Sequence, residues 1–389
     1  MPKRNLDYNI KLYYFLTVCS SLVFVAGNWL LFWLMFMNYG EVGIIDSIAY
    51  SFGLLMEVPT GAISDMVGKK KTINLAMIFG FLGIGLIGMA QNRYYVFAGF
   101  MLAQIGWAFY SGAMEALVYD SLIENGKEKA FDKVIGKAQS LGLISGVAAM
   151  IIGLFLYKFN PRLAYVGWSM AYLTGFIISL RLTEPAIDSE IFSWKNYKKS
   201  IIEGSKQLID LRILKFSVLF LSLGIFYAYD WGLIKPAIAI GFGFYNCGQS
   251  IIFAMSALIC AGIVSQLSKI RKHVSDIKGL WGITLLMALG LSLSGLRIGY
   301  WGVLVLLLIS VAGSLINPWM SVVINKNVKS NHRATALSAG ALVSKIPYSV
   351  LAVFAGLSAD NQNLNKFILG LVGAILISVM MSIYYERKN

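Results

Sequence analysis

Apolar runs about as long as a lipid bilayer is thick recur from one end of this chain to the other. A helix needs about 20 apolar residues to cross the hydrocarbon core. Of the 389 residues, 58% are apolar and only 13% are charged, whereas a soluble globular domain carries about 25% charged residues. The runs also lack the alternation of apolar and polar residues that marks a membrane β-barrel. The sequence therefore predicts an all-α membrane protein that crosses the bilayer many times.

The apolar runs define twelve expected transmembrane helices. They cover approximately residues 10–36, 42–65, 72–91, 94–122, 134–157, 162–182, 212–233, 246–267, 279–297, 301–323, 334–357 and 366–385. The longest polar interruption, 183–211, separates six spans from six. We therefore expect one six-helix bundle at 1–182, a central loop at 183–211 and a second six-helix bundle at 212–389. Within the loop, 194–203 is either an amphipathic helix on the membrane surface or a solvated linker.

The basic residues predict which way the chain is inserted. Of the 33 Lys and Arg residues, 26 fall in segments on one side of the expected membrane, 6 on the other, and Lys345 lies inside a span. Short cytoplasmic loops carry an excess of Lys and Arg. Both termini are therefore expected in the cytoplasm, and the protein in the cytoplasmic membrane. The same distribution accounts for the net charge of +14 without a nucleic-acid partner.

The sequence offers nothing from which to build a metal site or a catalytic centre. Cys19, Cys247 and Cys260 lie in or beside apolar runs and form no C-x-x-C, and His273 and His332 fall in basic loops. This usage fits neither a zinc site nor a disulfide framework. The chain also lacks a nucleophile elbow, an HExxH and a phosphate-binding glycine loop. We expect no metal, no cofactor and no enzymatic activity.

The loop after the second span carries a spaced motif. Gly61, Asp65 and Gly68 precede Lys69 and Lys70 in the pattern G-x-x-x-D-x-x-G-[KR]-[KR]. The glycines permit a close helix approach and a tight turn, and Asp65 can meet the positive end of a helix dipole. A degraded copy follows 201 residues later, with Gln in place of the Asp. The two halves therefore look like parallel repeats.

Extended upstream to Glu57-Val-Pro-Thr60, the motif resembles the signature loop of the major facilitator superfamily, in the version found in many bacterial drug exporters. Gly112–Ser121 and Arg333–Ser338 are similar to the same subgroup. The resemblance implies a transporter of two six-helix bundles. It also implies that Asp65 contacts the inner end of the eleventh span and holds the outward-facing state. The fourth span lacks the mid-span Arg of many proton-coupled exporters, and the fifth lacks their Pro, so proton antiport stays an open question.

Polar and aromatic residues recur at helical spacing on the first, fourth, seventh and tenth spans. By resemblance these spans line a central cavity; helix packing is the other explanation. The candidate cavity residues are Asn28, Gln104, Trp107, Ser111, Tyr227, Trp231, Ser314, Asn317 and Lys345. Lys345 lies about 16 Å from the inner surface at 1.5 Å per residue. A cation at that depth is expected to pair with Glu57, face an aqueous cavity or snorkel.

Four carboxylates inside or near the spans are candidates for proton coupling: Glu57, Glu115, Asp46 and Asp230. The sequence thus predicts a monomeric secondary transporter, surrounded by membrane lipid, that exports a small amphiphilic organic solute by alternating access. Protons are the candidate counter-ion. A siderophore or metabolite exporter and a lipid flippase are alternative transporters. A membrane receptor or scaffold on the same fold is the alternative from a different class.

The charge distribution makes a direct prediction about topology. Reporter fusions at Lys70, Lys199, Lys272 and Asn389 should all report a cytoplasmic location, because the basic segments remain inside. Fusions at Lys158 and Lys366 are the matched controls and should report the opposite side. A reporter at Asn389 that is active only outside the cytoplasm would contradict the twelve-span arrangement.

Overall fold

The computed structural model describes residues 6–186, 202, 211–245, 247–296, 298–327 and 333–388. These residues contain helices and no strands, which confirms the predicted fold class. Most of the expected loop at 183–211 lies outside them. The chain divides into two compact units: 1–37 with 48–193, and 38–47 with 194–389.

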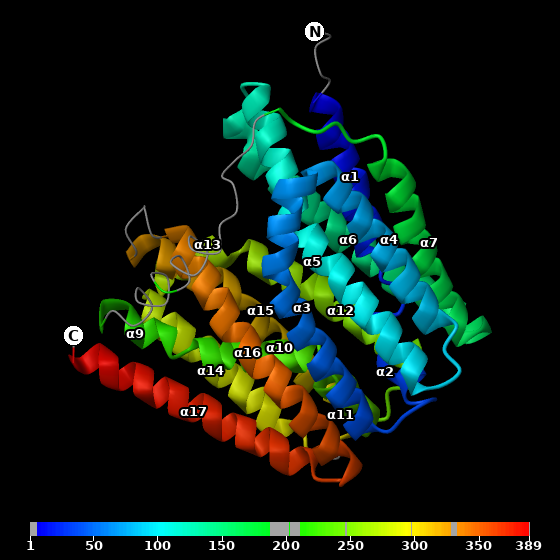
Figure 1. The fold of residues 1–389 in the computed structure, drawn as a ribbon. Coiled ribbons are helices and arrows are strands. Elements are labelled where there is room, and N and C mark those ends of the chain that lie inside the picture. The colour runs from blue at the N-terminus through cyan, green and yellow to red at the C-terminus, as the bar shows by residue number, and fades with distance from the viewer. Residues whose placement is uncertain are drawn as a thin grey trace. The chain divides into compact units, whose positions relative to one another are not determined.

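The described residues of the first unit form seven α-helices and one short 3-10 turn, which Figure 1 places in space. They are α1 (Leu6–Ser21), α2 (Trp29–Trp33), most of α3 (Tyr39–Val67), α4 (Lys69–Gly88), α5 (Arg93–Glu124), η1 (Glu128–Ala130), α6 (Phe131–Phe159) and α7 (Pro161–Ser179). Helix α4 packs along α5 and α7, while α1 packs against α5, α6 and α7. The six expected spans of this half are therefore all helical, although the first is not continuous.

The second unit holds the remaining helices. They are α9 (Leu211–Ser217), α10 (Phe220–Asp230), α11 (Ile234–Gly241), α12 (Cys247–Ser265), α13 (Leu267–His273), α14 (Asp276–Leu293), η2 (Gly299–Trp301), α15 (Gly302–Asn327), α16 (Arg333–Asp360) and α17 (Leu364–Lys388). Helix α10 packs against α16, and α14 packs against α15 and α17. The first turns of α3 also belong here, because the Asp360 carboxylate accepts hydrogen bonds from the amides of Tyr39 at 2.9 Å and Gly40 at 2.7 Å.

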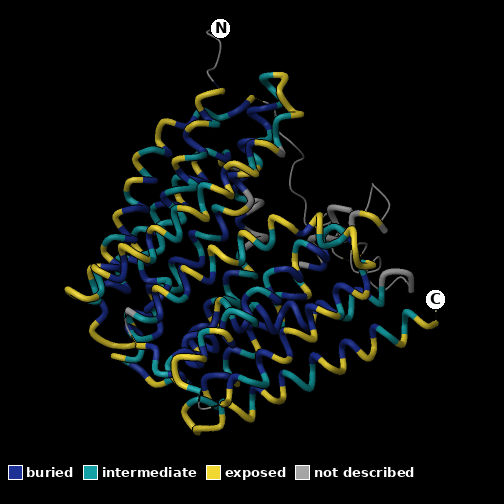
Figure 2. The backbone as a smooth tube through the Cα atoms, turned by 180° about the vertical axis from the view of Figure 1, so that it is seen from behind, coloured by how far each residue is buried: buried dark blue, intermediate teal, exposed yellow. Residues whose placement is uncertain are grey.

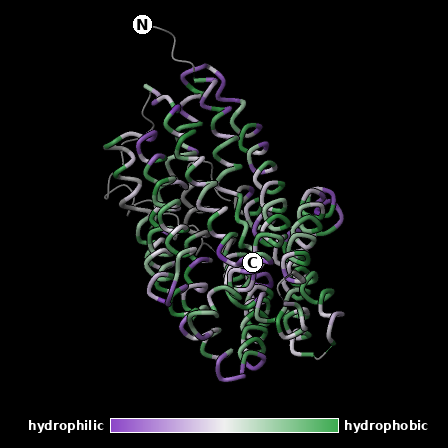
Figure 3. Tube along the Cα trace, turned by 90° about the vertical axis from the view of Figure 1, so that its right-hand side faces the viewer, coloured by the Kyte–Doolittle hydropathy of each residue, from purple (hydrophilic) through white to green (hydrophobic). Residues whose placement is uncertain are grey.

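Many of these helices are long and apolar enough to cross a membrane. Among the described residues eight helices qualify by length and composition, or nine if α10 and α11 count as one bent span. The other three expected spans are occupied by the α1–α2 pair, by α3 and by α7. Apolar residues dominate along the helices and hydrophilic ones gather near their ends (Figure 3). Exposed positions recur along the helices (Figure 2), as on α6, where Leu143, Ile144, Ile151, Ile152 and Phe155 form an apolar surface suited to lipid.

The first expected span, 10–36, is interrupted between α1 and α2. Residues 22–28 are not helical, and short-range bonds such as Val23 N–H to Ser21 O (2.8 Å) satisfy part of their backbone. Non-helical backbone at membrane depth is tolerated only inside protein or beside water. Here the Phe24 carbonyl lies against Gly153 of α6, where a Cβ would come within 1.8 Å of the carbonyl oxygen. A glycine at this point lets the interruption pack inside the bundle.

The seventh span is interrupted as well. Helix α10 ends at Asp230 and α11 begins at Ile234, with a bend of 59° between them. The intervening Gly232 faces Tyr348 of α16, at 3.3 Å from the position its Cβ would take. The expected span 212–233 therefore continues past its predicted end through a bend.

The contact at Gly153 predicts a specific loss of stability. Gly153→Val should lower the apparent melting temperature of the purified protein in detergent, because overpacking a filled site costs about 1–3 kcal/mol. Gly136→Ala is the matched control on the same helix, since nothing lies within 4 Å of the Cβ it would add. That change should be neutral or stabilise by about 0.5–1 kcal/mol. Equal melting temperatures for the two variants would contradict the close approach of Phe24.

Candidate functional site

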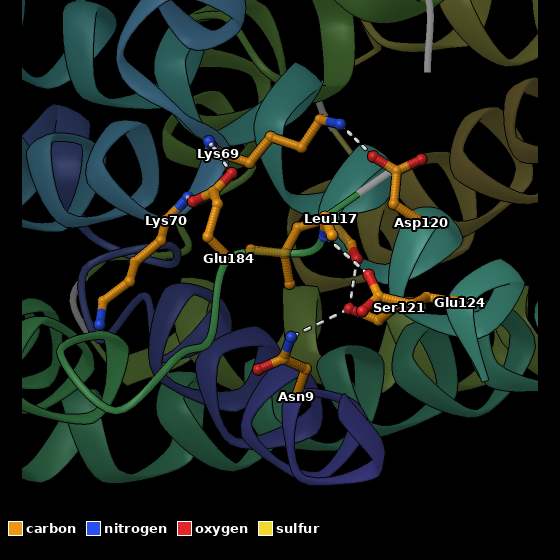
Figure 4. A network of polar contacts seen from close by, with 9 residues as sticks. Asn9, Lys69, Lys70, Leu117, Asp120, Ser121, Glu124 and Glu184 are labelled. Atoms are coloured by element: carbon orange, nitrogen blue, oxygen red, sulfur yellow. Dashed lines mark hydrogen bonds and ion pairs between the residues drawn. The ribbon is translucent and has the colours of Figure 1, made fainter. Parts of the chain in front are cut away.

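The N-terminus of helix α4 is capped by a carboxylate from the segment that follows α7. Gly68 precedes the helix with φ of 95°, a conformation that favours glycine. The two oxygens of Glu184, five residues after the end of α7, accept hydrogen bonds from the backbone amides of Lys69 and Lys70, each at 2.7 Å (Figure 4). A negative charge is stabilising at the N-terminus of a helix. Glu184 therefore caps α4 and fixes the chain after α7 to it.

The side chain of Lys69 turns away from this cap and forms an ion pair with Asp120 of α5 (Figure 4). Only 5% of the Lys69 side chain and none of the Asp120 side chain is exposed. Taking two charges out of water is costly, and removing one partner of such a pair is more costly still. The pair therefore requires α4 and α5 to keep one arrangement at this end of the bundle.

Asn9 of α1 completes the connection. Its side-chain amide donates to the Thr183 carbonyl at 2.8 Å and accepts from the Thr183 amide at 3.0 Å. The same Nδ2 donates to Ser121 Oγ at 2.9 Å. We call Asn9, Lys69, Asp120, Ser121 and Glu184 the polar network. It joins α1, α4, α5 and the segment after α7 within the first unit.

The polar network contains part of the sequence motif and omits part of it. Lys69 and Lys70 lie at the cap, and Gly68 forms the turn before it. Gly61 and Asp65 lie in α3, and the side chain of Asp65 lies outside the described residues. The sequence interpretation gave no role to Asn9, Asp120 or Glu184. Asp120 and Ser121 end the segment Gly112–Ser121 that resembles the exporter subgroup, and Glu184 is an acid just after the sixth span, but no pattern in the sequence connects them.

The second half of the chain places a similar arrangement at its repeat of the motif. Asp276, the first residue of α14, accepts hydrogen bonds from Arg271 Nε at 2.9 Å and Nη2 at 2.8 Å. Trp319 Nε1 donates to the same carboxylate at 3.0 Å and Lys326 Nζ at 3.1 Å. In each half a basic residue of the motif loop, although not at the same motif position, is thus paired with an acid of its own unit.

The candidate cavity residues of the first unit lie largely inside it. Asn28 is buried in the interruption of the first span. Gln104 of α5 is buried against Gly53 of α3, with its Oε1 2.6 Å from the position a Cβ would take. Trp107 Nε1 donates to the Tyr172 hydroxyl at 2.7 Å. Ser111, one turn further along α5, is exposed. A role in solute contact stays a prediction for all four.

In the second unit two candidate residues meet directly. The rings of Tyr227 and Trp231 are stacked, with centroids 4.3 Å apart and planes 11° apart. On α15, Ser314 donates to the Val311 carbonyl at 3.0 Å and Asn317 is exposed. Lys345 of α16 is half-buried. Its expected partner Glu57 has a side chain outside the described residues, so that pairing stays a prediction.

The other candidate carboxylates have different surroundings. Asp46 is 4% exposed and accepts a hydrogen bond from the Tyr348 hydroxyl at 2.6 Å. Asp230 pairs with Lys235 at 2.7 Å, and Glu115 is exposed. Among the described residues, no group of three or more His, Cys, Asp or Glu side chains is arranged to hold a metal ion.

Comparisons with known proteins converge on one family. The model of the Major Facilitator Superfamily matches residues 13–352. The fold is similar to a mutant of the nucleoside transporter NupG (TM-score 0.79, 14% identity, covering 98% of this chain and 100% of that one). It is also similar to a bacterial homologue of the human lysosomal transporter Spinster (0.71, 15%, 100% and 98%) and to a D-xylose–proton symporter (0.69, 11%, 98% and 96%). A comparison with curated proteins gives no match.

The buried ion pair makes the polar network testable. Asp120→Asn removes the carboxylate that the buried Lys69 ammonium contacts, so it should destabilise the protein by about 3–5 kcal/mol. The apparent melting temperature in detergent measures this. Lys69→Met combined with Asp120→Leu should recover most of the loss, because both charges leave together.

Asp7→Asn is the control for that measurement. Its exposed carboxylate pairs with Lys127 at 2.8 Å, and the hydrogen bond from Lys127 lowers the pKa of Asp7. An exposed pair is worth about 0–1 kcal/mol, so the loss should be small. If Asp120→Asn cost no more than Asp7→Asn, the buried pair would have no structural role.

Proposed function

Because this chain belongs to the major facilitator superfamily, we propose that it exports a small amphiphilic organic solute by alternating access. It is a multi-pass membrane transporter rather than an enzyme. We propose three further features of this transporter: the direction of transport, the class of solute, and a location in the cytoplasmic membrane with both termini inside. The polar network is the observation that carries the mechanism, because it occupies the loop in which the sequence predicts a gate.

The polar network supports movement of the first bundle as one body. Glu184 caps α4, Lys69 pairs with α5, and Asn9 holds α1 to the chain after α7. Alternating access in two-bundle transporters is largely a rigid-body rocking motion, which requires stiff bundles. In the proposed cycle, Asp65 adds a contact to the inner end of the eleventh span that exists only in the outward-facing state.

The aromatic character of the candidate cavity residues supports an amphiphilic solute. Trp107, Tyr227 and Trp231 offer ring surfaces, whereas Gln104, Ser111 and Ser314 offer neutral hydrogen-bonding groups. Ligand sites of this kind combine apolar walls with a few polar groups that fix orientation. The similar structures named above belong to a nucleoside transporter and a xylose symporter. Solutes of those classes are the alternatives that the transport experiment must include.

Asp46 is the carboxylate that we propose for proton coupling. It is buried, and its hydrogen bond comes from a hydroxyl group, Tyr348. Burying a carboxylate charge beside a neutral donor costs free energy, and a bound proton removes that cost. Movement of the first turns of α3 away from Tyr348 would expose Asp46 to water and let it release the proton.

Transport into proteoliposomes tests this function. Purified protein should move an amphiphilic fluorescent solute faster with a pH gradient than without one. Asp46→Asn should remove the dependence on the gradient, because an amide cannot carry the proton. Asp7→Asn, far from Tyr348 in the sequence and at the exposed start of α1, is the matched control and should behave as wild type. If the protein transported only a nucleoside or xylose, and only by uptake, the export proposal would be wrong. Equal transport rates with and without the pH gradient would contradict proton coupling.

A further inference from the structure

The bend in the seventh span holds an ion pair whose carboxylate is more exposed than its ammonium. Lys235 Nζ of α11 donates to Asp230 Oδ1 at the end of α10, at 2.7 Å. The Lys235 side chain is 11% exposed, whereas that of Asp230 is 29% exposed. A small charged molecule can therefore reach the carboxylate more readily than the ammonium.

Lys235 has contacts that remain when Asp230 is taken away. Its Nζ lies 4.8 Å from the centre of the Phe253 ring and 5.9 Å from that of Tyr229. Gln249, one turn before Phe253 on α12, donates to the carbonyls of Pro236 and Phe244, and its buried Oε1 has no hydrogen-bond partner among the described residues. Aromatic faces and an open amide oxygen both stabilise an ammonium group. Asp230 can thus be given up without stranding a bare cation.

An aromatic surface lies directly beside this carboxylate in the chain. Trp231 follows Asp230, stacks on Tyr227 with one face and is 48% exposed. Gly224, Tyr227 and Trp231 are spaced so that they lie on one face of α10. A Cβ added at Gly224 would come within 2.7 Å of the Ser344 carbonyl of α16. This face of α10 therefore packs against α16.

We propose that Asp230 and Trp231 form a subsite for a planar organic cation, with Lys235 as the internal counter-ion that the solute displaces. The cation stacks on the open face of the indole and pairs with Asp230, while Lys235 stays between Phe253 and Tyr229 and turns toward Gln249. The subsite rests on the proposed function, since it names the class of solute that is exported. A flat cation gains both from the charge of Asp230 and from the ring of Trp231.

Two probes of similar shape separate the contribution of charge to binding from that of ring stacking. 10-Methylacridinium is a permanent planar cation, and acridine is neutral in alkaline buffer. Their binding to the purified full chain is measured by fluorescence anisotropy, independently of transport. Asp230→Asn should weaken 10-methylacridinium binding about tenfold, equivalent to about 1.4 kcal/mol, and leave acridine binding unchanged. Trp231→Leu should weaken the binding of both probes.

Lys235→Met is the variant whose effect has the opposite sign. It removes the competing ammonium, so the cation should bind several-fold more tightly, which a merely damaged protein would not show. This keeps the test valid if Asp230→Asn fails to fold. Trp301→Leu, an exposed tryptophan of η2 outside the subsite, and Asp7→Asn are the matched controls and should change neither probe.

Binding and transport can fail separately. No binding of 10-methylacridinium to wild type, or equal binding by Asp230→Asn together with no tighter binding by Lys235→Met, would overturn the subsite and leave Trp231 as an anchor at the membrane interface. Transport of another solute could still be intact in that case. Binding that depends on Asp230 without transport of any solute would uphold the subsite and overturn the export proposal instead.

Discussion

The buried pair of Lys69 and Asp120 is the interaction on which the arrangement of the first unit depends. An ammonium group that is nearly excluded from water must keep its carboxylate within reach. Glu184 fixes the other side of the same lysine by capping its backbone amide. Together they leave the start of α4 no freedom to slide against α5. In the second unit Arg271 and Asp276 provide the corresponding neutralisation, but there both residues come from one short stretch of chain.

The helices were predictable and the contacts between their ends were not. Long apolar runs identify spans because the bilayer requires a minimum length, so the expected boundaries fall close to those of α4, α12 or α14. Asn9, Asp120 and Glu184 lie far apart in the sequence, and no spacing rule connects them. The interruption at 22–28 was missed for a different reason. Its residues Leu22 to Val25 remain apolar, so a change of backbone conformation leaves no trace in hydropathy.

The two interruptions lie close to each other in the two repeats but not at the same positions, because with a shift of 202, residues 22–28 fall on 224–230 of α10. Asn28-Trp29 follows an alanine and a glycine at the first, and Asp230-Trp231 follows an alanine and a tyrosine at the second, 202 residues later. The first site has an amide where the second has a carboxylate, and Trp33 stands where Lys235 does. The residues beside the interruption are thus neutral in the first half, whereas in the second half they form an ion pair. Trp33 donates its indole hydrogen bond to Tyr165 at 3.1 Å, so the neutral copy is integrated into the core of its bundle.

The pairing of Asn9 with Thr183 has a consequence for the order of synthesis. It joins the first helix of the unit to the segment that follows α7, so all residues of this contact are present once Thr183 has been made. Domains generally fold as units during translation, the N-terminal one first. The first turns of α3 are the exception, because their partners Tyr348 and Asp360 lie near the end of the chain. The first turns of α3 therefore meet these partners only after nearly the whole second half of the protein has been made.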